Sequence, residues 1–181
     1  MKVAALILAG SKSTRMGEDK GLLKKYGNYW VELIQEELPV SVECFTSVGK
    51  HNLEAYKAAG FENLVIDKEG LEDFAGPIKG VLSGLQEFAA FDKLLVIPCD
   101  MINLKTEHFE LLLKEDKTAC FGLNGMLEPL PFVLNPKDFM KINSEKLKNL
   151  SLQQVLEMQG VEVLKIQDVY GFKNYNSKVD L

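Results

Sequence analysis

The sequence predicts an α/β protein built on a mostly parallel sheet, with helices on both faces of that sheet. Short apolar runs alternate with segments whose apolar residues recur at helical spacing along most of the 181 residues. The first run, Val3–Leu8, contains no polar side chain, which is typical of a strand covered on both faces. A loop rich in small and cationic residues follows it. Because ligands of open α/β sheets bind beyond the carboxyl ends of strands, we expect the functional residues to follow strands.

Each predicted element has a local justification. Trp30–Leu38 is predicted to be an amphipathic helix that ends before Pro39, because proline restricts the residue ahead of it. Pro77 favours the start of a longer helix that reaches about Ala89. The turn Asn124-Gly125 indicates a hairpin. The other predicted strands are Val42–Ser47, Asn63–Ile66, Lys93–Ile97, Thr118–Gly122, Leu130–Leu134 and Val161–Ile166, and the other helices are Leu53–Ala59, Glu107–Leu113 and Leu152–Met158.

Composition limits the class of protein. The length suits one domain, residues 1–181, and 46% hydrophobic with 26% charged residues is an ordinary globular composition. The net charge of −5 argues against a general nucleic-acid surface. No apolar run approaches the ~18 residues that span a bilayer, and no secretion signal is evident, so no membrane partner is expected. Three widely spaced cysteines fit reduced thiols in the cytoplasm, and two histidines offer little material for a metal site or a catalytic triad.

The loop after the first strand predicts an anion site. Gly10 and Gly17 allow tight bends in which backbone N–H groups face a ligand. Lys12, Arg15 and Lys20 add positive charge that can meet phosphate oxygens. The spacing matches neither the P-loop nor the dinucleotide fingerprint. A solvated surface loop is the alternative, but the position after an N-terminal strand favours phosphate binding.

Two aspartates follow later strands. Asp100 comes directly after a buried run and is a candidate Mg²⁺ ligand, because Mg²⁺ prefers one or two carboxylates together with substrate phosphates. The alternative is an N-cap or turn before the next helix. Asp67 has the same position after its strand, and a role as a turn residue is an equal alternative.

Three further segments are candidates for the site. Gly76 opens a helix whose N-terminus favours anions, and Gly80 in the first turn leaves room for a ligand or for close helix packing. Glu128 belongs either to the acceptor side of the site or to a rigid turn. Asn174 and Asn176 share one face if the chain is extended there, either contacting a ligand or capping a helix.

Five segments, taken in order, are similar to motifs of one family. They are Leu8–Lys20 continued by Gly21-Leu22-Leu23, Gly76–Gly80, Pro98-Cys99-Asp100, Glu128–Pro131 and Phe172–Ser177. With these motifs the chain resembles the molybdenum cofactor guanylyltransferases, the MobA-type nucleotidyltransferases. The resemblance implies a Rossmann-like three-layer α/β/α nucleotidyltransferase fold with a mostly parallel central sheet. It also implies transfer of GMP from GTP to the phosphate of Mo-molybdopterin, and transient contacts with cofactor-synthesis proteins and apo-molybdoenzymes.

The resemblance also assigns roles to individual residues. Nucleotide and phosphate contacts are implied for Leu8, Ala9, Gly10, Ser11, Lys12, Ser13, Lys20, Asp67 and Gly76, contacts to the reacting phosphates or the pterin for Asn174 and Asn176, a metal-binding role for Asp100, and catalytic roles for Arg15, Lys20 and Asp100. The implied cofactor is Mg²⁺, held by Asp100.

Other functions stay open at this point. A molybdopterin cytidylyltransferase or a sugar- or polyol-phosphate nucleotidyltransferase would use the same phosphate loop. A nucleotide-binding protein without catalysis is an alternative of another class. That alternative rests on Ser11, where the family motif has a second glycine, and on Lys79, where it has a small residue.

Overall fold

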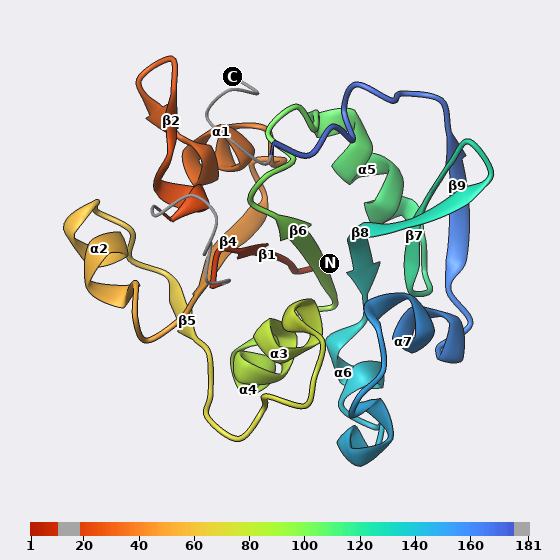
Figure 1. Ribbon diagram of the computed structural model, residues 1–181. Coiled ribbons are helices and arrows are strands. Elements are labelled where there is room, and N and C mark those ends of the chain that lie inside the picture. The colour runs from red at the N-terminus through yellow and green to blue at the C-terminus, as the bar shows by residue number, and fades with distance from the viewer. Residues whose placement is uncertain (11–18, 176–181) are drawn as a thin grey trace.

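A computed structural model describes residues 1–10 and 19–175 of the chain. These residues form a seven-stranded sheet in the order β5-β4-β1-β6-β8-β7-β9, with a two-stranded hairpin, β2-β3, beside it (Figure 1). β8 runs antiparallel to both of its neighbours, and the other pairings in the large sheet are parallel. The strands are β1 (Val3–Leu8), β2 (Lys24–Lys25), β3 (Asn28–Tyr29), β4 (Val42–Val48), β5 (Leu64–Ile66), β6 (Lys93–Pro98), β7 (Ala119–Leu123), β8 (Met126–Leu134) and β9 (Glu162–Ile166).

Helices cover both faces of the sheet. One buried cluster joins the sheet to α1, α2 and α5, and a second joins it to α3, α4, α6 and α7. The α-helices are α1 (Trp30–Glu36), α2 (Leu53–Ala58), α3 (Gly76–Ser83), α4 (Leu85–Phe88), α5 (Thr106–Lys114), α6 (Pro136–Phe139) and α7 (Leu152–Met158), and the short 3₁₀ helices are η1 (Lys20–Leu22) and η2 (Ser144–Leu147). The predicted α/β class, with its mostly parallel sheet and flanking helices, is confirmed.

The two-residue period of a strand divides the central apolar runs between the two clusters. In β1, Ala5 and Ile7 join the cluster beneath α1, α2 and α5, while Ala4 and Leu6 join the opposite one. All four are completely buried. This explains why β1 carries no polar residue: both of its faces are covered by helices.

The predicted long helix from Pro77 to Ala89 is wrong as a single element. It divides at Gly84, whose backbone (φ −100°, ψ 13°) leaves the helical region between α3 and α4. A Cβ added to Gly84 would lie 2.6 Å from the ring of Phe88 and 3.0 Å from Val65. The glycine therefore lets the chain bend and brings the Phe88 ring close to the backbone.

Several predicted boundaries also move. α1 ends at Glu36 rather than at Leu38, and the strand predicted from Leu130 begins four residues earlier, at Met126. Part of the additional strand pairs with β7 after a register shift between Cys120 and Phe121. The β2-β3 hairpin was not predicted from the sequence pattern. No helix in the described ranges combines the length and the apolar character that a bilayer crossing requires.

Candidate functional site

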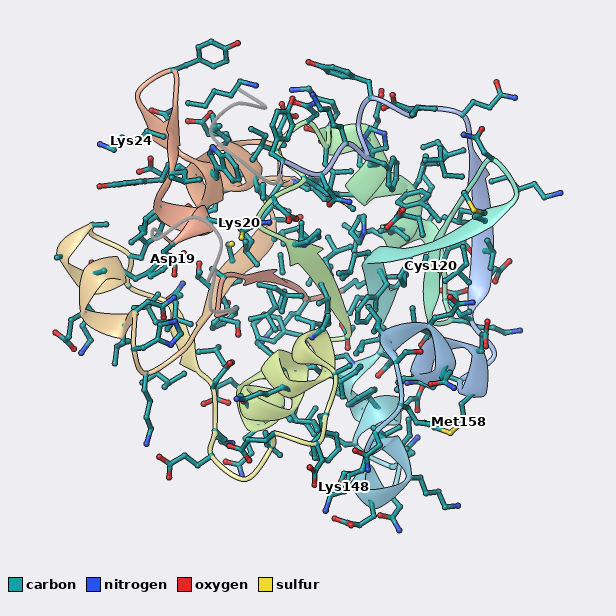
Figure 2. The ribbon with its side chains drawn as sticks, viewed as in Figure 1. Asp19, Lys20, Lys24, Cys120, Lys148 and Met158 are labelled. Carbon is teal, nitrogen blue, oxygen red and sulfur yellow. The ribbon has the colours of Figure 1, made fainter. Side chains whose placement is uncertain are left out.

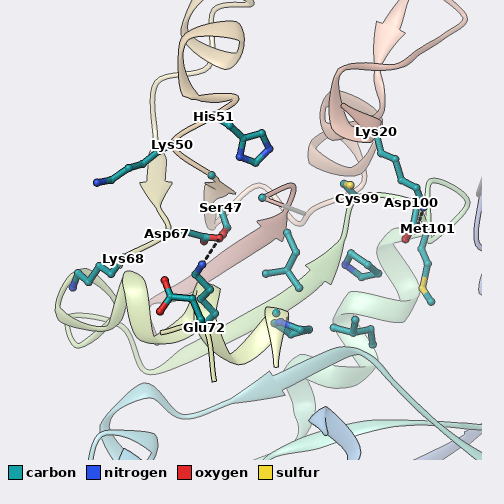
Figure 3. A pocket seen from close by; sticks show the side chains of 18 of the residues that line it. Lys20, Ser47, Lys50, His51, Asp67, Lys68, Glu72, Cys99, Asp100 and Met101 are labelled. Carbon is teal, nitrogen blue, oxygen red and sulfur yellow. Dashed lines mark hydrogen bonds and ion pairs between the residues drawn. The ribbon is translucent and has the colours of Figure 1, made fainter. Parts of the chain in front are cut away.

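A cavity of about 780 Å³ opens at the carboxyl ends of β1, β4, β5 and β6 (Figure 3). Its volume is typical of small-molecule sites. Its lining residues come from the ends of these strands and the loops after them, from η1, from the start of α3, from β8 and from the chain after β9. They are Leu8, Gly10, Lys20, Ser47, Gly49, Lys50, His51, Asp67, Lys68, Glu69, Glu72, Gly76, Pro77, Lys79, Pro98, Cys99, Asp100, Met101, Glu128, Leu130 and Asn174.

Parallel register brings the strand ends to one edge of the sheet. Leu8 is aligned with Ser47 of β4 and with Pro98 of β6. The pairing continues beyond the strands, because Cys99 N donates to Leu8 O at 3.3 Å and Asp67 N donates to Val48 O at 2.9 Å. Asp67 and Asp100, which follow strands, therefore lie at this edge and line the cavity, while their predicted functional roles stay predictions.

Asp100 is paired with Lys20. The Nζ atom of Lys20 lies 2.9 Å from Oδ2 of Asp100, and both side chains are about one-fifth exposed, at 19% and 20%. Asp100 does not cap the next helix, since α5 begins at Thr106 with Lys105 at its N-cap. The backbone carbonyl of Asp100 accepts from Tyr175 N at 3.0 Å. The N-cap alternative for Asp100 is therefore wrong, whereas the turn alternative holds, since Cys99 and Asp100 form a turn; the carboxylate faces the cavity.

Asp19 fixes the element that carries Lys20, a role that the sequence pattern did not indicate. Its Oδ1 accepts from Tyr56 OH at 2.6 Å and from Gly21 N at 3.0 Å, and its Oδ2 accepts from Asn52 Nδ2. Figure 2 shows Asp19 and Lys20 beside each other where η1 begins. A partly buried carboxylate that accepts this many hydrogen bonds holds η1 against α2 and so determines where the Lys20 side chain starts.

The sequence carries one signal for two members of this network, although that signal does not identify Asp19 as their partner. Asn52 and Tyr56 are four residues apart, a spacing that places both side chains on one face of a helix. Asn52 also donates to the backbone carbonyl of Ala9 at 3.1 Å. The same side chain thus ties the end of the first strand to the start of η1.

Asp67 occupies the other side of the cavity. Its Oδ1 accepts from the hydroxyl of Ser47 at 3.0 Å, and its Oδ2 lies 3.8 Å from Nζ of Lys79. Burial raises the pKa of Asp67, and the hydrogen bond from Ser47 and the charge of Lys79 offset that effect only in part. Gly10 lies close by, since a Cβ at this position would be 3.0 Å from Oδ2 of Asp67. Asp67 is thus a partly desolvated acceptor in the cavity.

The start of α3 closes the same side. Gly76 lines the cavity, and nothing lies within 4 Å of a Cβ built on it. At Gly80 a Cβ would lie 3.0 Å from Leu8 Cδ2 and 3.1 Å from Ser47 Oγ. Of the two explanations for Gly80, close helix packing therefore applies: the glycine lets α3 approach β1 and β4.

Two more predicted segments reach the cavity. Asn174 lines it from the segment that follows β9, and Glu128 lines it from β8. Burial raises the pKa of the Glu128 carboxyl. Because Glu128 lies within a nine-residue strand, the rigid-turn alternative for it is wrong.

The cavity brings together most of the predicted site residues that the structure describes. Those lining it are Leu8, Gly10, Lys20, Asp67, Gly76, Asp100 and Asn174. Ala9 is 2% exposed and contributes backbone hydrogen bonds rather than cavity surface. Ser11, Lys12, Ser13, Arg15 and Asn176 lie outside the described residues, so their predicted roles stay predictions.

Comparison with known proteins agrees with this arrangement. Residues 5–163 match the family model described as "MobA-like NTP transferase domain". A "Probable molybdenum cofactor guanylyltransferase" from Pyrococcus horikoshii is 30% identical over 201 residues, covering 100% of this chain and 98% of the relative. Another protein of that name, from Bacillus cereus (strain G9842), is 26% identical over 187 residues, covering 97% of this chain and 92% of the relative.

Solved structures share the fold. Molybdopterin-guanine dinucleotide biosynthesis protein A from Archaeoglobus fulgidus superposes with a TM-score of 0.69 at 17% identity, covering 98% of this chain and 94% of that one. At this identity the likeness concerns the fold alone. The family model spans most of the chain, and each of the five motifs contributes at least one described residue to the lining of the cavity. The chain therefore belongs to the family of MobA-like nucleotidyltransferases.

Proposed function

We propose that this protein transfers GMP from GTP to the phosphate of Mo-molybdopterin, forming molybdopterin guanine dinucleotide and pyrophosphate. The relatives from Pyrococcus horikoshii and Bacillus cereus are named probable molybdenum cofactor guanylyltransferases, and this chain matches nearly their whole length. The observation that carries the proposal for this chain is the Lys20–Asp100 pair, set in a cavity that Asp67 and Asn174 also line. Its volume of about 780 Å³ is in the range of sites that enclose a small molecule.

The reaction is an in-line displacement at phosphorus. An oxygen of the acceptor phosphate forms a bond to the α-phosphorus of GTP. The bond from that phosphorus to the oxygen bridging the α- and β-phosphates breaks, and pyrophosphate leaves with the electron pair. The attacking phosphate is already ionised at neutral pH, so the step requires positioning and charge stabilisation rather than a strong base.

The side chains of the cavity suit these tasks. Lys20 donates to phosphate oxygens and stabilises the charge that develops on the leaving pyrophosphate. Arg15, with Lys12, Ser11 and Ser13, extends the same role in the proposal. Leu8, Ala9, Gly10, Asp67 and Gly76 contact the nucleotide, and Asn174 and Asn176 face the reacting phosphates or the pterin.

Cys99 lines the cavity but is not activated as a nucleophile. Burial, together with the neighbouring Asp100 charge, raises the pKa of this thiol above its ordinary value. Cys99 therefore remains a neutral thiol, which is a poor nucleophile. A direct transfer between the two phosphates accords with this chemistry.

A magnesium ion fits the donor set. Asp100 offers a hard carboxylate oxygen, whereas residues 1–10 and 19–175 contain no cluster of three or more metal-binding side chains. A cation held here would take most of its ligands from substrate phosphates and water, which is the coordination that Mg²⁺ favours. When bound, Mg²⁺ supplies positive charge to the α-phosphate.

The setting of the reaction follows from the same proposal. Cys44, Cys99 and Cys120 are free thiols, which accords with the reducing cytoplasm. Transfer of a labile cofactor implies transient contacts with the proteins that synthesise it and with the apo-molybdoenzymes that receive it. GTP and Mo-molybdopterin are the two substrates of the proposal.

Pyrophosphate release tests the activity. The purified chain is incubated with Mg²⁺, molybdopterin and one of GTP, CTP, ATP or UTP, and we expect release with GTP. A parallel thermal-shift series measures binding, and the preferred nucleotide should raise Tm most. Release with CTP in place of GTP would identify a cytidylyltransferase. Nucleotide binding without release in any mixture would identify a binding protein without catalysis.

A further inference from the structure

The chain between β9 and the end of the described residues carries Asn174 into the cavity, yet residues 167–175 form neither helix nor strand. In Figure 1 this segment crosses from β9 over α5. A segment without a hydrogen-bond ladder keeps a fixed position only through individual anchors. The anchors of this segment therefore determine where the Asn174 amide lies.

The first anchor is a pair of side chains, His108 and Asp168. His108 lies in α5 and is 1% exposed, and its Nε2 lies 3.1 Å from Oδ2 of Asp168. Its other ring nitrogen, Nδ1, accepts from Lys105 N at 2.9 Å. Since Nδ1 is an acceptor, the neutral ring carries its proton on Nε2 and donates it to Asp168.

Asp168 also fixes the backbone that follows it, so the contact with His108 holds that backbone near α5. Its Oδ1 accepts from Tyr170 N and from Gly171 N, both at 3.1 Å. A Cβ at Gly171 would lie 2.4 Å from Oδ2 of Asp168 and 3.1 Å from the His108 ring. The absence of a side chain at Gly171 thus lets the backbone approach the histidine this closely.

Aromatic packing secures the next residue. The Phe172 ring lies edge-on to His108, with centroids 5.5 Å apart, and to Phe121 of β7, with centroids 5.1 Å apart. Phe172 is 5% exposed, so this contact is part of the buried core. Asn174 follows two residues later.

The second anchor lies beyond Asn174. Tyr175 N donates to the carbonyl of Asp100 at 3.0 Å, and Asn103 donates to the Tyr175 hydroxyl at 2.9 Å. The Tyr175 ring packs edge-on against Trp30 at 6.0 Å. Asn174 therefore lies between two anchored points of the segment: Asp168, which is held by His108 of α5, and Tyr175, which is held by the loop that carries Asp100.

We propose that His108 and Asp168 are positioning residues, which clamp the segment after β9 onto α5 so that Asn174 meets the substrate in the cavity. This inference rests on the proposed function for the identity of that substrate. It concerns residues outside the cavity lining, and it predicts an effect on transfer that acts through Asn174.

Asp168→Asn is the variant of choice because it keeps the shape of the side chain. If the new amide oxygen faces Tyr170 N and Gly171 N, its NH₂ group faces the Nε2–H of His108. If the amide flips, its NH₂ group faces Tyr170 N–H and Gly171 N–H instead. If the imidazole moves its proton to Nδ1, that N–H faces the N–H of Lys105. Every arrangement loses at least one hydrogen bond of the clamp. The matched control is Asp138→Asn on α6, where the carboxylate is also ion-paired, to Lys141 at 2.7 Å, and is 69% exposed.

Two measurements test the clamp. Amide hydrogen exchange in residues 168–175 should be about tenfold faster in Asp168→Asn and unchanged in the control, while circular dichroism reports an intact fold. The value of kcat/KM for molybdopterin should fall about tenfold in Asp168→Asn, since small misplacements of positioning groups reduce rates by such factors. In an Asn174→Ala background the same change should lower kcat/KM less than about twofold.

The outcomes separate the two proposals. Unchanged exchange in Asp168→Asn, or a full tenfold loss of kcat/KM in the Asn174→Ala background, would overturn the clamp. A wild-type chain that releases no pyrophosphate would overturn the proposed function, and the exchange measurement would still decide whether the clamp holds the segment. Gly171→Ala provides a second variant, for which we expect the same pattern of exchange.

Discussion

Two lysine–aspartate pairs face the same cavity and are held in different ways. Lys20 and Asp100 approach to 2.9 Å, whereas Lys79 and Asp67 are 3.8 Å apart. The first distance is that of a charge-assisted hydrogen bond, and the second exceeds hydrogen-bond range, so the second pair interacts through charge alone. In Figure 3 Asp67 and Asp100 lie at opposite sides of the pocket.

The difference arises from the support behind each pair. η1 is fixed by Asp19, and the backbone of Asp100 is held by Tyr175. On the other side, Ser47 supports the Asp67 carboxylate, while Lys79 reaches it from the first turn of α3. We call Lys20–Asp100 the braced pair and Lys79–Asp67 the loose pair. Both residues of the braced pair match family motifs, whereas Lys79 of the loose pair departs from its motif. We therefore expect Lys20 and Asp100 to have the larger effects on the proposed reaction, and Lys79 to have a smaller one.

The largest effect is expected at Asp100. Replacing it with asparagine removes the negative charge but keeps the size, and we expect kcat to fall about 10²- to 10³-fold, the effect of losing charge stabilisation at the reacting phosphate. Pyrophosphate release measures the loss, and circular dichroism checks the fold. A kcat within tenfold of wild type would mean that Asp100 has no essential role in the mechanism. The distinction between the two lysine–aspartate pairs would then fail as well.

The next effect is expected at Lys20. Lys20→Ala removes charge-assisted hydrogen bonds to phosphate, and we expect GTP affinity to weaken about 10- to 100-fold, as measured by calorimetry. Lys24→Ala is the matched control: Lys24 lies in β2, its ammonium packs over the Tyr29 ring at 4.4 Å, and it does not line the cavity (Figure 2). Equal losses in the two variants would indicate a general effect of charge and not a site.

Much of this site could be predicted from the sequence, because strand ends are local features. Gly10 and Asp100 follow buried apolar runs, Asp67 follows a short apolar run, and parallel pairing then brings the three to one edge. The supports could not be predicted in this way. Asp19 and Tyr56 are 37 residues apart, and no periodicity in the sequence indicates such a contact.

The division of the predicted helix at Gly84 has a similar cause. It depends on a Phe88 ring and a Val65 side chain that are adjacent only in the folded chain. Tyr175 likewise reaches Asp100 only after the segment beyond β9 has crossed α5. Local patterns predicted the chemistry at the strand ends, and tertiary packing determines how firmly each group is held.

A smaller effect is expected at Lys79. Lys79→Ala restores the small residue of the family motif and removes a partly exposed ion pair, which is worth at most about 1 kcal/mol. We expect GTP affinity to change less than about threefold in the same calorimetric assay, because the braced pair on the other side is untouched. A loss as large as that of Lys20→Ala would show that the two pairs contribute equally and would break the comparison.

The smallest effect concerns the stability contributed by Asp67. Burial raises the pKa of this carboxyl, so the folded protein binds the proton more tightly than the unfolded chain does. In wild type, ionisation at neutral pH therefore costs stability, and that cost disappears as the pH falls through the raised pKa toward the ordinary aspartate value of about 3.9. Asp67→Asn carries no charge, and its amide oxygen can still accept from Ser47. We expect its Tm to exceed that of wild type by at most about 2–4 °C at pH 7, and the difference to shrink on acidification. A Tm difference that grew as the pH fell would mean that the ionised Asp67 carboxylate stabilises the fold. Asp67 would then be held by its partners as firmly as Asp100 is, and burial would not dominate its pKa.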